Sequence, residues 1–201
     1  MEQRTEEWHH ARLGKVTASR TADVVAKTKT GWGASRAEYM AHLACERLTG
    51  QPTEGFTSKA MQWGTDTEGR ARAAYELHTG NSVVEVGFIA RDDMAAGASP
   101  DGLVGDDGLV EIKCPNTSTH IETLLKGSIS GKYHLQMQWQ MACTDRQWCD
   151  FVSFDPRLPV DLELFIKRVE RDNVLIADLE TEVRKFLGEL DNMISQLTGA
   201  K

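Results

Sequence analysis

Two acidic residues and a lysine lie close together in the middle of the chain: Asp101, Glu111 and Lys113. Asp101 belongs to the run Ser-Pro-Asp-Gly at 99–102, and the other two belong to the run Glu-Ile-Lys. Carboxylate oxygens are the ligands that Mg²⁺ and Mn²⁺ prefer. Such a cation polarises a phosphoryl oxygen and activates water, and a nearby ammonium group stabilises the charge that develops. These residue types therefore favour metal-assisted hydrolytic chemistry.

The turn signal Gly-Asp-Asp-Gly at 105–108 predicts a β-hairpin between these two runs. In the register that this turn favours, Asp101 lies opposite Glu111, with Cβ atoms about 5 Å apart on one face. Lys113 shares that face and Ile112 points into the core, because strand side chains alternate. Two carboxylates this close repel each other, and a divalent cation relieves the repulsion. The alternative is a surface hairpin with an acidic turn and an exposed Glu–Lys pair; the Ser-Pro-Asp-Gly run and the apolar flanks favour the metal site.

The elements that must position these residues follow from apolar spacing and from turn and cap signals. Ser35, with Glu38 three residues later, predicts a helix N-terminus, and Gly80 predicts the end of the helix that carries Glu68. Helices are expected over 35–48, 58–78, 117–126 and 131–144, and strands over 83–89, 103–104, 109–113 and 148–154.

Two segments leave alternatives open. From residue 160 the apolar residues recur every three or four positions, which predicts a helical extension over about 160–198. That extension could cover its own sheet or meet another subunit. Residues 25–35 are rich in Lys, Thr and Gly and are expected to form a loop, in which Trp32 either contacts nucleic acid or belongs to a plain linker.

Composition sets the broad class. The chain has 201 residues, of which 40% are hydrophobic and 26% charged, and its net charge of -7 argues against nonspecific coating of nucleic acid. It does not exclude a cationic channel on an acidic protein. With a charged N-terminus and no long apolar run, the sequence predicts a cytoplasmic protein with no membrane contact. Four cysteines without a Cys-x-x-Cys pair are expected to be reduced thiols rather than zinc or iron–sulfur ligands.

Four blocks between residues 6 and 156 resemble the PD-(D/E)xK nuclease superfamily, and within it the phage lambda exonuclease and the YqaJ-type viral recombinases. In order, the blocks are Trp8-x-x-x-Arg12-x-Gly14-x-x-Thr17-Ala18-Ser19, Trp63-Gly64-x-x-x-Glu68, Ser99-Pro100-Asp101-Gly102 with Glu111-Ile112-Lys113, and Tyr133-x-x-Gln136-x-Gln138. The resemblance implies an α/β fold of the α+β type: a restriction-endonuclease-like core with a central mixed sheet flanked by helices and a long C-terminal helix. It implies one nuclease domain over 1–201, with its core over about 6–156.

The resemblance also implies roles for the matching residues. Asp101, Glu111, the Ile112 carbonyl and Glu68 would bind Mg²⁺, with Mn²⁺ as a substitute and two ions per site, and Lys113 would assist the nucleophile. Arg12, Ser19 and Ser99 would bind a 5′-terminal phosphate. The residues expected to contact DNA near the scissile bond are Gln136, Tyr133 and Trp8.

Some of these positions have a structural alternative. The guanidinium of Arg12 suits a phosphate, but an isolated arginine is more often in a surface salt bridge. Gln136, Gln138 and Gln140 could simply form a solvated helix face, and only Gln136 matches a functional position of the family.

The function implied is a magnesium-dependent 5′-to-3′ exonuclease on linear double-stranded DNA, which prefers 5′-phosphorylated ends and leaves 3′ overhangs for recombination by strand annealing. The implied partners are DNA ends, two further copies of the chain in a trimeric ring, and a single-strand annealing protein. An endonuclease or junction-resolving enzyme of the same superfamily, or a non-catalytic DNA-binding relative, are the alternatives. Retention of Asp101, Glu111 and Lys113 together speaks against the last of these.

Overall fold

The computed structural model describes residues 1–53 and 58–199. Its largest sheet is built from five strands: β4 (Val83–Val84), β7 (Gly102–Val104), β8 (Gly108–Lys113), β9 (Trp148–Phe154) and β10 (Leu164–Glu170). Their order across the sheet is β10-β9-β8-β7-β4. β8 and β9 run parallel and the other neighbours are antiparallel, so the sheet is mixed, as the resemblance implies.

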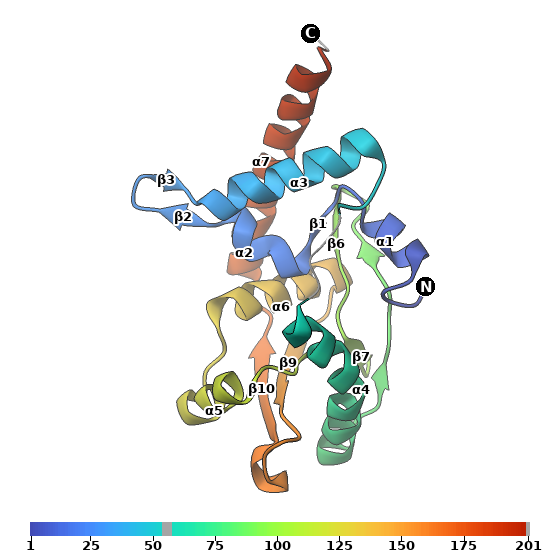
Figure 1. Ribbon diagram of the computed structural model, residues 1–201, viewed down its shortest axis with the longest axis vertical. Helices are drawn as coiled ribbons and strands as arrows, with labels where there is room; N and C mark the ends of the chain where they lie inside the picture. The colour runs from blue at the N-terminus through green and yellow to red at the C-terminus, as the bar shows by residue number, and fades with distance from the viewer. Residues whose placement is uncertain (54–57, 200–201) are drawn as a thin grey trace.

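A smaller sheet and a hairpin complete the strands. The smaller sheet has the order β1-β6-β5 and is built from β1 (Val16–Thr17), β5 (Ile89–Ala90) and β6 (Ala96–Ala98). The hairpin is formed by β2 (Lys27–Thr28) and β3 (Gly31–Trp32). In Figure 1 this hairpin projects sideways from the body of the molecule.

Helices lie on both sides of the sheets and around them. They are α1 (Glu6–Arg12), α2 (Thr21–Val24), α3 (Ala34–Thr49), α4 (Lys59–Thr79), α5 (Thr117–Lys126), α6 (Gly131–Thr144) and α7 (Asn173–Thr198), with 3-10 turns η1 (Ala18–Arg20) and η2 (Val160–Leu162). Figure 1 shows the large sheet in the lower half of the view, beneath α6, and α3 and α7 crossing in the upper half.

Strand β8 is covered on both faces, which explains its almost wholly buried sequence. Val110 and Ile112 pack against α4 in one hydrophobic cluster. Leu109, on the opposite face, packs against Met137 and Met141 of α6 in another. Glu111 and Lys113 share the α6 face, since side chains alternate along a strand.

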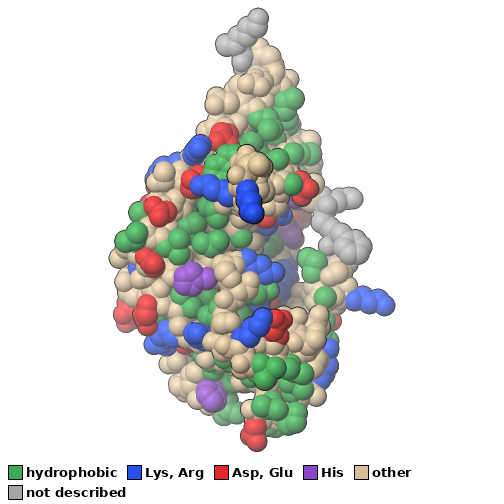
Figure 2. Space-filling model, turned by 90° about the vertical axis from the view of Figure 1, so that its left-hand side faces the viewer, with side chains coloured by type: hydrophobic (Ala, Val, Ile, Leu, Met, Phe, Trp, Pro, Cys, Tyr) green, Lys and Arg blue, Asp and Glu red, His purple; other side chains and the backbone are tan. Residues whose placement is uncertain are grey.

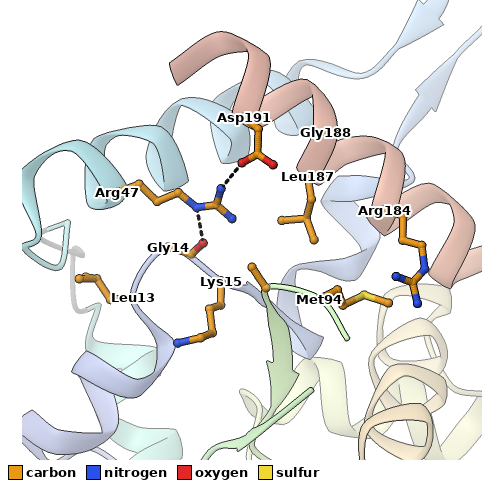
Figure 3. Close-up of a pocket in the computed structure, with 10 residues that line it drawn as sticks. Leu13, Gly14, Lys15, Arg47, Met94, Arg184, Leu187, Gly188 and Asp191 are labelled. Carbon is orange, nitrogen blue, oxygen red and sulfur yellow. Dashed lines mark hydrogen bonds and ion pairs between the residues drawn. The ribbon is translucent and has the colours of Figure 1, made fainter. Parts of the chain in front are cut away.

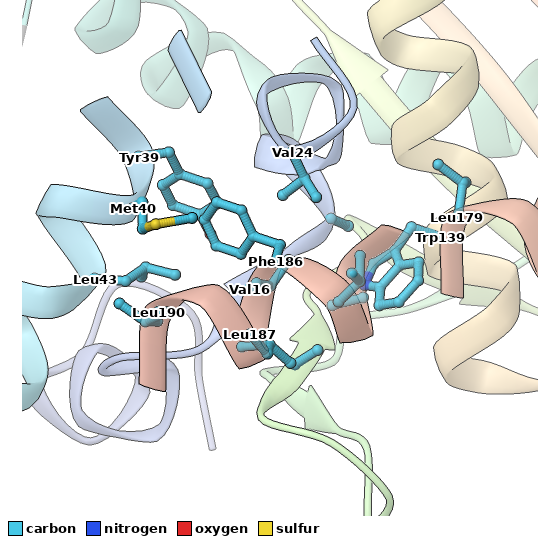
Figure 4. Close-up of a cluster of buried hydrophobic side chains, with 14 of the residues drawn as sticks. Val16, Val24, Tyr39, Met40, Leu43, Trp139, Leu179, Phe186, Leu187 and Leu190 are labelled. Atoms are coloured by element: carbon cyan, nitrogen blue, oxygen red, sulfur yellow. The ribbon is translucent and has the colours of Figure 1, made fainter. Parts of the chain in front are cut away.

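A third cluster joins the smaller sheet to the upper helices (Figure 4). The rings of Tyr39 in α3 and Phe186 in α7 stack with centroids 5.7 Å apart, and Trp139 of α6 is fully buried beside Leu179 of α7. The buried stripe of α7 ends at Leu190, and Leu197 near its end is 65% exposed. Most of α7 therefore covers its own domain, while its last turns extend beyond the body (Figure 1).

Several expectations are confirmed. The β7–β8 hairpin pairs Gly102 with Val110 and Val104 with Gly108, which is the register that places Asp101 opposite Glu111. Helices α5 and α6 and strand β9 have the bounds expected from the sequence. Ser58 caps α4 through its side chain, and Gly80 ends it in a left-handed conformation.

The expected helical extension over about 160–198 is wrong in its first third. Residues 164–170 form β10, an edge strand antiparallel to β9, and α7 begins only at Asn173. Asp172 is the N-cap of α7, because its carboxylate accepts hydrogen bonds from the backbone N–H groups of Val174 and Leu175. The apolar spacing before this cap suits a strand as well as a helix, and pairing with β9 decides between them.

Three local expectations in the first half are also wrong. Helix α3 begins at Ala34 without a side-chain cap, because Gly33 donates its N–H to the Ala26 carbonyl and the β2–β3 hairpin leads directly into the helix. The segment 25–35 is therefore largely a hairpin rather than a loop. Residues 83–89 do not form one strand: β4 pairs with β7 and β5 pairs with β6, so the chain passes from one sheet to the other.

Three further observations concern membrane-spanning helices, surface charge and the cysteines. Within residues 1–53 and 58–199, no helix combines the length and apolar character that crossing a membrane requires. The face shown in Figure 2 carries Lys, Arg, Asp and Glu side chains of both signs, interspersed with one another. The free cysteines are Cys45, Cys114, Cys143 and Cys149.

The close pairing of Gly108 with Trp148 yields a prediction about stability. A Cβ at Gly108 would overlap the indole ring of Trp148, which is itself covered by the Arg168 guanidinium at 3.5 Å. We expect Gly108→Ala to lower the free energy of unfolding by about 1–3 kcal/mol. The control Gly69→Ala, at an exposed position in α4 where a Cβ meets no described atom within 4 Å, should raise it by about 0.5–1 kcal/mol. Urea denaturation of both variants measures this, and a Gly108→Ala protein as stable as wild type would contradict the packing.

Candidate active site

Asp101, Glu111 and Lys113 lie together at one end of the β7–β8 hairpin. Asp101 directly precedes β7, and its Oδ2 accepts a hydrogen bond of 2.6 Å from the backbone N–H of Ile112. Lys113 is the last residue of β8, and its Nζ forms an ion pair with Glu111 Oε1. The hairpin therefore brings two carboxylates and an amine to one place.

Helix α6 closes over Glu111, which is only 1% exposed. The side-chain amide of Gln136 donates to Oε1 at 2.7 Å, and that of Gln140 donates to Oε2 at 2.6 Å. Gln138, between them, faces elsewhere and donates to the Glu170 carbonyl. All three glutamines are buried, so the interpretation of a solvated helix face is wrong.

The charges at this site act strongly on one another. Burial raises the pKa of Asp101 well above its usual range, and the Glu111 carboxylate raises it further while Lys113 opposes the rise. Burial by itself lowers the pKa of Lys113, but the carboxylates of Glu111 and Asp101 outweigh it and the net pKa is raised. Two acidic groups thus compete for too little positive charge, which is the condition that a divalent cation relieves.

Glu68 adds a third carboxylate from α4. Its charge is among those that raise the pKa of Asp101, so it belongs to the same electrostatic cluster. Its oxygens are held by two arginines, Arg4 at 2.5 Å and Arg72 at 3.5 Å. Arg4 comes from the N-terminal segment, which Gln3 fixes by donating to the carbonyls of Val86 and Pro100.

The oxygen donors here fit Mg²⁺ or Mn²⁺ in type. Across the described residues, no group of three or more His, Cys, Asp or Glu side chains is arranged to hold a metal ion. Each carboxylate is instead turned toward a partner in the chain: Glu111 toward Lys113 and the α6 amides, Asp101 toward a backbone N–H, and Glu68 toward arginines. A cation bound here would therefore compete with some of these partners for the carboxylate oxygens. The side chain of Ile112 packs in the core, as expected.

A second polar cluster surrounds Ser99, which follows β6. Trp8 donates its indole N–H to Ser99 Oγ at 2.9 Å, and Arg12 Nη1 lies 3.4 Å from the same oxygen. The Arg12 guanidinium stacks on the Trp8 ring at 3.9 Å. Burial lowers the pKa of Arg12. Within the described part of the chain Arg12 forms no ion pair.

Ser19 lies just after β1, at the same end of the smaller sheet as Ser99. β1 and β6 are parallel, with Thr17 opposite Gly97, so the two serines follow adjacent strands in the same direction. Ser19 is exposed. Tyr133 lies beside the first cluster: its ring centroid is 5.2 Å from Lys113 Nζ, and it stacks on Phe151.

Sequence reasoning missed two of these residues. Gln140 stands one helical turn after Gln136, and that i,i+4 spacing is a signal that could have identified it. Arg4 carries no such signal, because only the tertiary fold brings the N-terminal segment to Glu68.

The cavity in Figure 3 is a separate feature of about 610 Å³. Arg47 crosses it, donating to the Gly14 carbonyl at 2.8 Å and pairing with Asp191 at 2.6 Å. None of the residues expected to bind metal or phosphate lines it.

The chain resembles known proteins along most of its length. The crystal structure of an alkaline exonuclease (LHK-Exo) from Laribacter hongkongensis shares 58% identity over 96% of both chains, with a TM-score of 0.90, and the same holds for that enzyme in complex with dAMP. A phage related exonuclease from Haemophilus somnus 129PT shares the fold, with a TM-score of 0.73 at 18% identity over 91% of this chain and 96% of that one. A comparison with curated proteins gives no match.

Residues 7–147 match the sequence profile of the YqaJ-like viral recombinase domain. That span is more than half of the chain and includes both polar clusters. The chain therefore belongs to the YqaJ-like viral recombinase domain family.

Proposed function

We propose that this protein is a magnesium-dependent 5′-to-3′ exonuclease that degrades one strand of linear double-stranded DNA and leaves 3′ single-stranded overhangs for recombination by strand annealing. The observation that carries the proposal is the grouping of Asp101, Glu111 and Lys113 at the end of one hairpin. Two comparisons support it: the family is that of viral recombinases, and a protein 58% identical is an alkaline exonuclease.

The reaction assigns a task to each group of this cluster. Asp101, Glu111, the Ile112 carbonyl and Glu68 are the proposed ligands of two Mg²⁺ or Mn²⁺ ions, which supply Lewis-acid activation of the phosphate when bound. Lys113 keeps its proton, because its pKa is raised, so its ammonium can orient the attacking water or balance the charge on the scissile phosphate. Gln136, which donates to Glu111, and Tyr133, whose ring lies beside Lys113, are proposed to contact DNA near the scissile bond.

The second cluster supports the proposed polarity. Arg12, Ser19 and Ser99 are the proposed pocket for a 5′-terminal phosphate, and Trp8 holds both Arg12 and Ser99 in place. A terminal phosphate bound there would fix the strand end relative to the cluster that cuts it. The neighbour solved with dAMP supports the exonuclease activity alone, because a nucleoside monophosphate is the kind of product that an exonuclease of either polarity releases.

The proposed partners rest on the resemblance to the lambda-type exonucleases. A single domain of 201 residues does not encircle a DNA duplex, so we propose a homotrimeric ring around DNA ends. A single-strand annealing protein would receive the exposed strand, and the proposed compartment is the cytoplasm of a bacterial or phage-infected cell.

The polarity and the need for an end are tested with linear and covalently closed circular duplexes of the same sequence. We expect Mg²⁺-dependent digestion of the linear form alone, with label released from the 5′ end and a 3′ overhang retained. Cleavage of the circle would favour an endonuclease of the same superfamily, and the absence of cleavage of either form would favour a non-catalytic DNA-binding relative.

Removal of the Lys113 amine separates catalysis from binding. We expect Lys113→Ala to lose about 10²–10³ in turnover while it still binds Mn²⁺ and linear duplex. Lys126→Ala removes an exposed lysine of α5, which pairs with Glu122, and should keep turnover. Single-turnover digestion measures both variants, and a wild-type rate for Lys113→Ala would show that this amine has no catalytic part.

Loss of Arg12 should change the choice of substrate rather than the chemistry. Charge-assisted hydrogen bonds contribute about 1.5–3 kcal/mol, so Arg12→Ala should reduce the preference for 5′-phosphorylated over 5′-hydroxyl ends about 10- to 100-fold. Arg12→Lys keeps the charge but loses the planar fork, and should fall between wild type and Arg12→Ala. The rate ratio of the two ends measures this, and an unchanged ratio would place the phosphate pocket elsewhere.

A further inference from the structure

Gln140 of α6 is a buried residue whose side-chain amide contacts the Glu111 carboxylate. It is 0% exposed, and its amide nitrogen donates to Glu111 Oε2 at 2.6 Å. Gln136, one helical turn earlier, donates to the other oxygen of the same carboxylate at 2.7 Å. Side chains four residues apart lie on one face of a helix, so α6 offers two amides to a single carboxylate.

The two oxygens of Glu111 have different surroundings. Oε1 contacts Lys113, whose side chain is 27% exposed, and Gln136, which reaches the surface with 8%. Oε2 contacts the fully buried Gln140. Oε1 therefore points toward the open side of the cluster, and Oε2 points into the layer between β8 and α6.

The amide oxygen of Gln140 shows that this side chain does not serve packing alone. Its Oε1 is buried without a hydrogen-bond partner among the described residues. A buried polar atom left without a partner destabilises a fold, so an apolar side chain would fill this place better if packing were the only requirement. What Gln140 offers that an apolar residue lacks is its bond to Glu111.

We propose that Gln140 is a positioning residue for a divalent cation: by fixing Oε2, it holds the Glu111 carboxylate so that Oε1 faces Lys113 and the cation. This inference rests on the proposed function, because it takes Glu111 as a metal ligand. Gln140 does not touch substrate or metal and acts through Glu111 alone. Residues that orient a ligand in this way typically change metal affinity about 10- to 100-fold when they are removed.

Gln138 provides a matched control on the same helix. It is equally buried, but it bonds to the β10–α7 connection, donating to the Glu170 carbonyl and accepting from the Asp172 N–H. Its replacement therefore removes a buried glutamine of α6 without changing any contact of Glu111. A loss of fold stability and a loss of metal site can be told apart in this way.

The experiment is Mn²⁺ titration followed by electron paramagnetic resonance on wild type, Gln140→Met and Gln138→Met, with melting temperatures recorded without metal. Methionine keeps the length of the side chain and removes the donor. We expect Mn²⁺ affinity to fall about 10- to 100-fold in Gln140→Met, and to stay at the wild-type value in Gln138→Met while its melting temperature falls. If Gln140→Met does not unfold cooperatively, Gln140→Asn replaces it, since its shorter side chain withdraws the same donor.

The possible outcomes distinguish failure of the positioning role of Gln140 from failure of the proposed metal site. Wild-type affinity in a folded Gln140 variant would overturn the positioning role and leave the metal site intact. Equal losses in the Gln140 and Gln138 variants would also overturn it, since they would reflect a general weakening of α6. A wild-type protein that binds no Mn²⁺ would overturn the metal site itself.

Discussion

Glu111 is a carboxylate in the central strand of the main sheet, between two layers of helix, and only 1% of its surface is exposed. A charge buried in this way costs several kcal/mol unless it is paired and hydrogen-bonded. The fold meets that requirement with three donors, the amine of Lys113 and the amides of Gln136 and Gln140. The arrangement of β8, the turn before it and the face of α6 all depend on this group, because each provides or positions one of its partners.

Asp101, Glu111 and Glu68 lie in one acidic cluster, and the basic groups near them are shared unevenly. Asp101 is turned to a backbone N–H and its pKa is raised, and Glu68 depends on Arg4 and Arg72. The protein thus balances its acidic groups with its own side chains, and a divalent cation would compete with those contacts for the same oxygens.

The two polar clusters lie at the ends of different sheets, and the short segment between β6 and β7 keeps them close together. Strand β6 of the smaller sheet ends in Ala98, Ser99 and Pro100 follow, and Asp101 leads into β7 of the larger sheet. Ser99, a candidate phosphate contact, is therefore only two residues from Asp101, a candidate metal ligand. A site that recognises a strand end and cuts beside it needs such a short and well-packed connection. Trp8 and Arg12 of α1 cover it from the N-terminal side.

The sequence by itself determined the features that depend on neighbouring residues. The Gly-Asp-Asp-Gly turn set the register that places Asp101 opposite Glu111, Gly80 marked the end of α4, and the helical pattern located α5 and α6. These are local because turn geometry and helix periodicity act over a few residues. The roles of the site residues came from resemblance to a family and remain proposals.

Only the tertiary structure decided the features that depend on distant partners. The stretch 164–170 has apolar spacing compatible with a helix, and it became β10 because β9 offers an edge to pair with. Gln140 reads as a solvated residue until α6 lies against β8, and Arg4 has no visible partner until the N-terminal segment crosses to Glu68. The physical reason is the same in each case: hydrogen bonding and charge pairing between residues far apart in sequence outweigh weak local preferences.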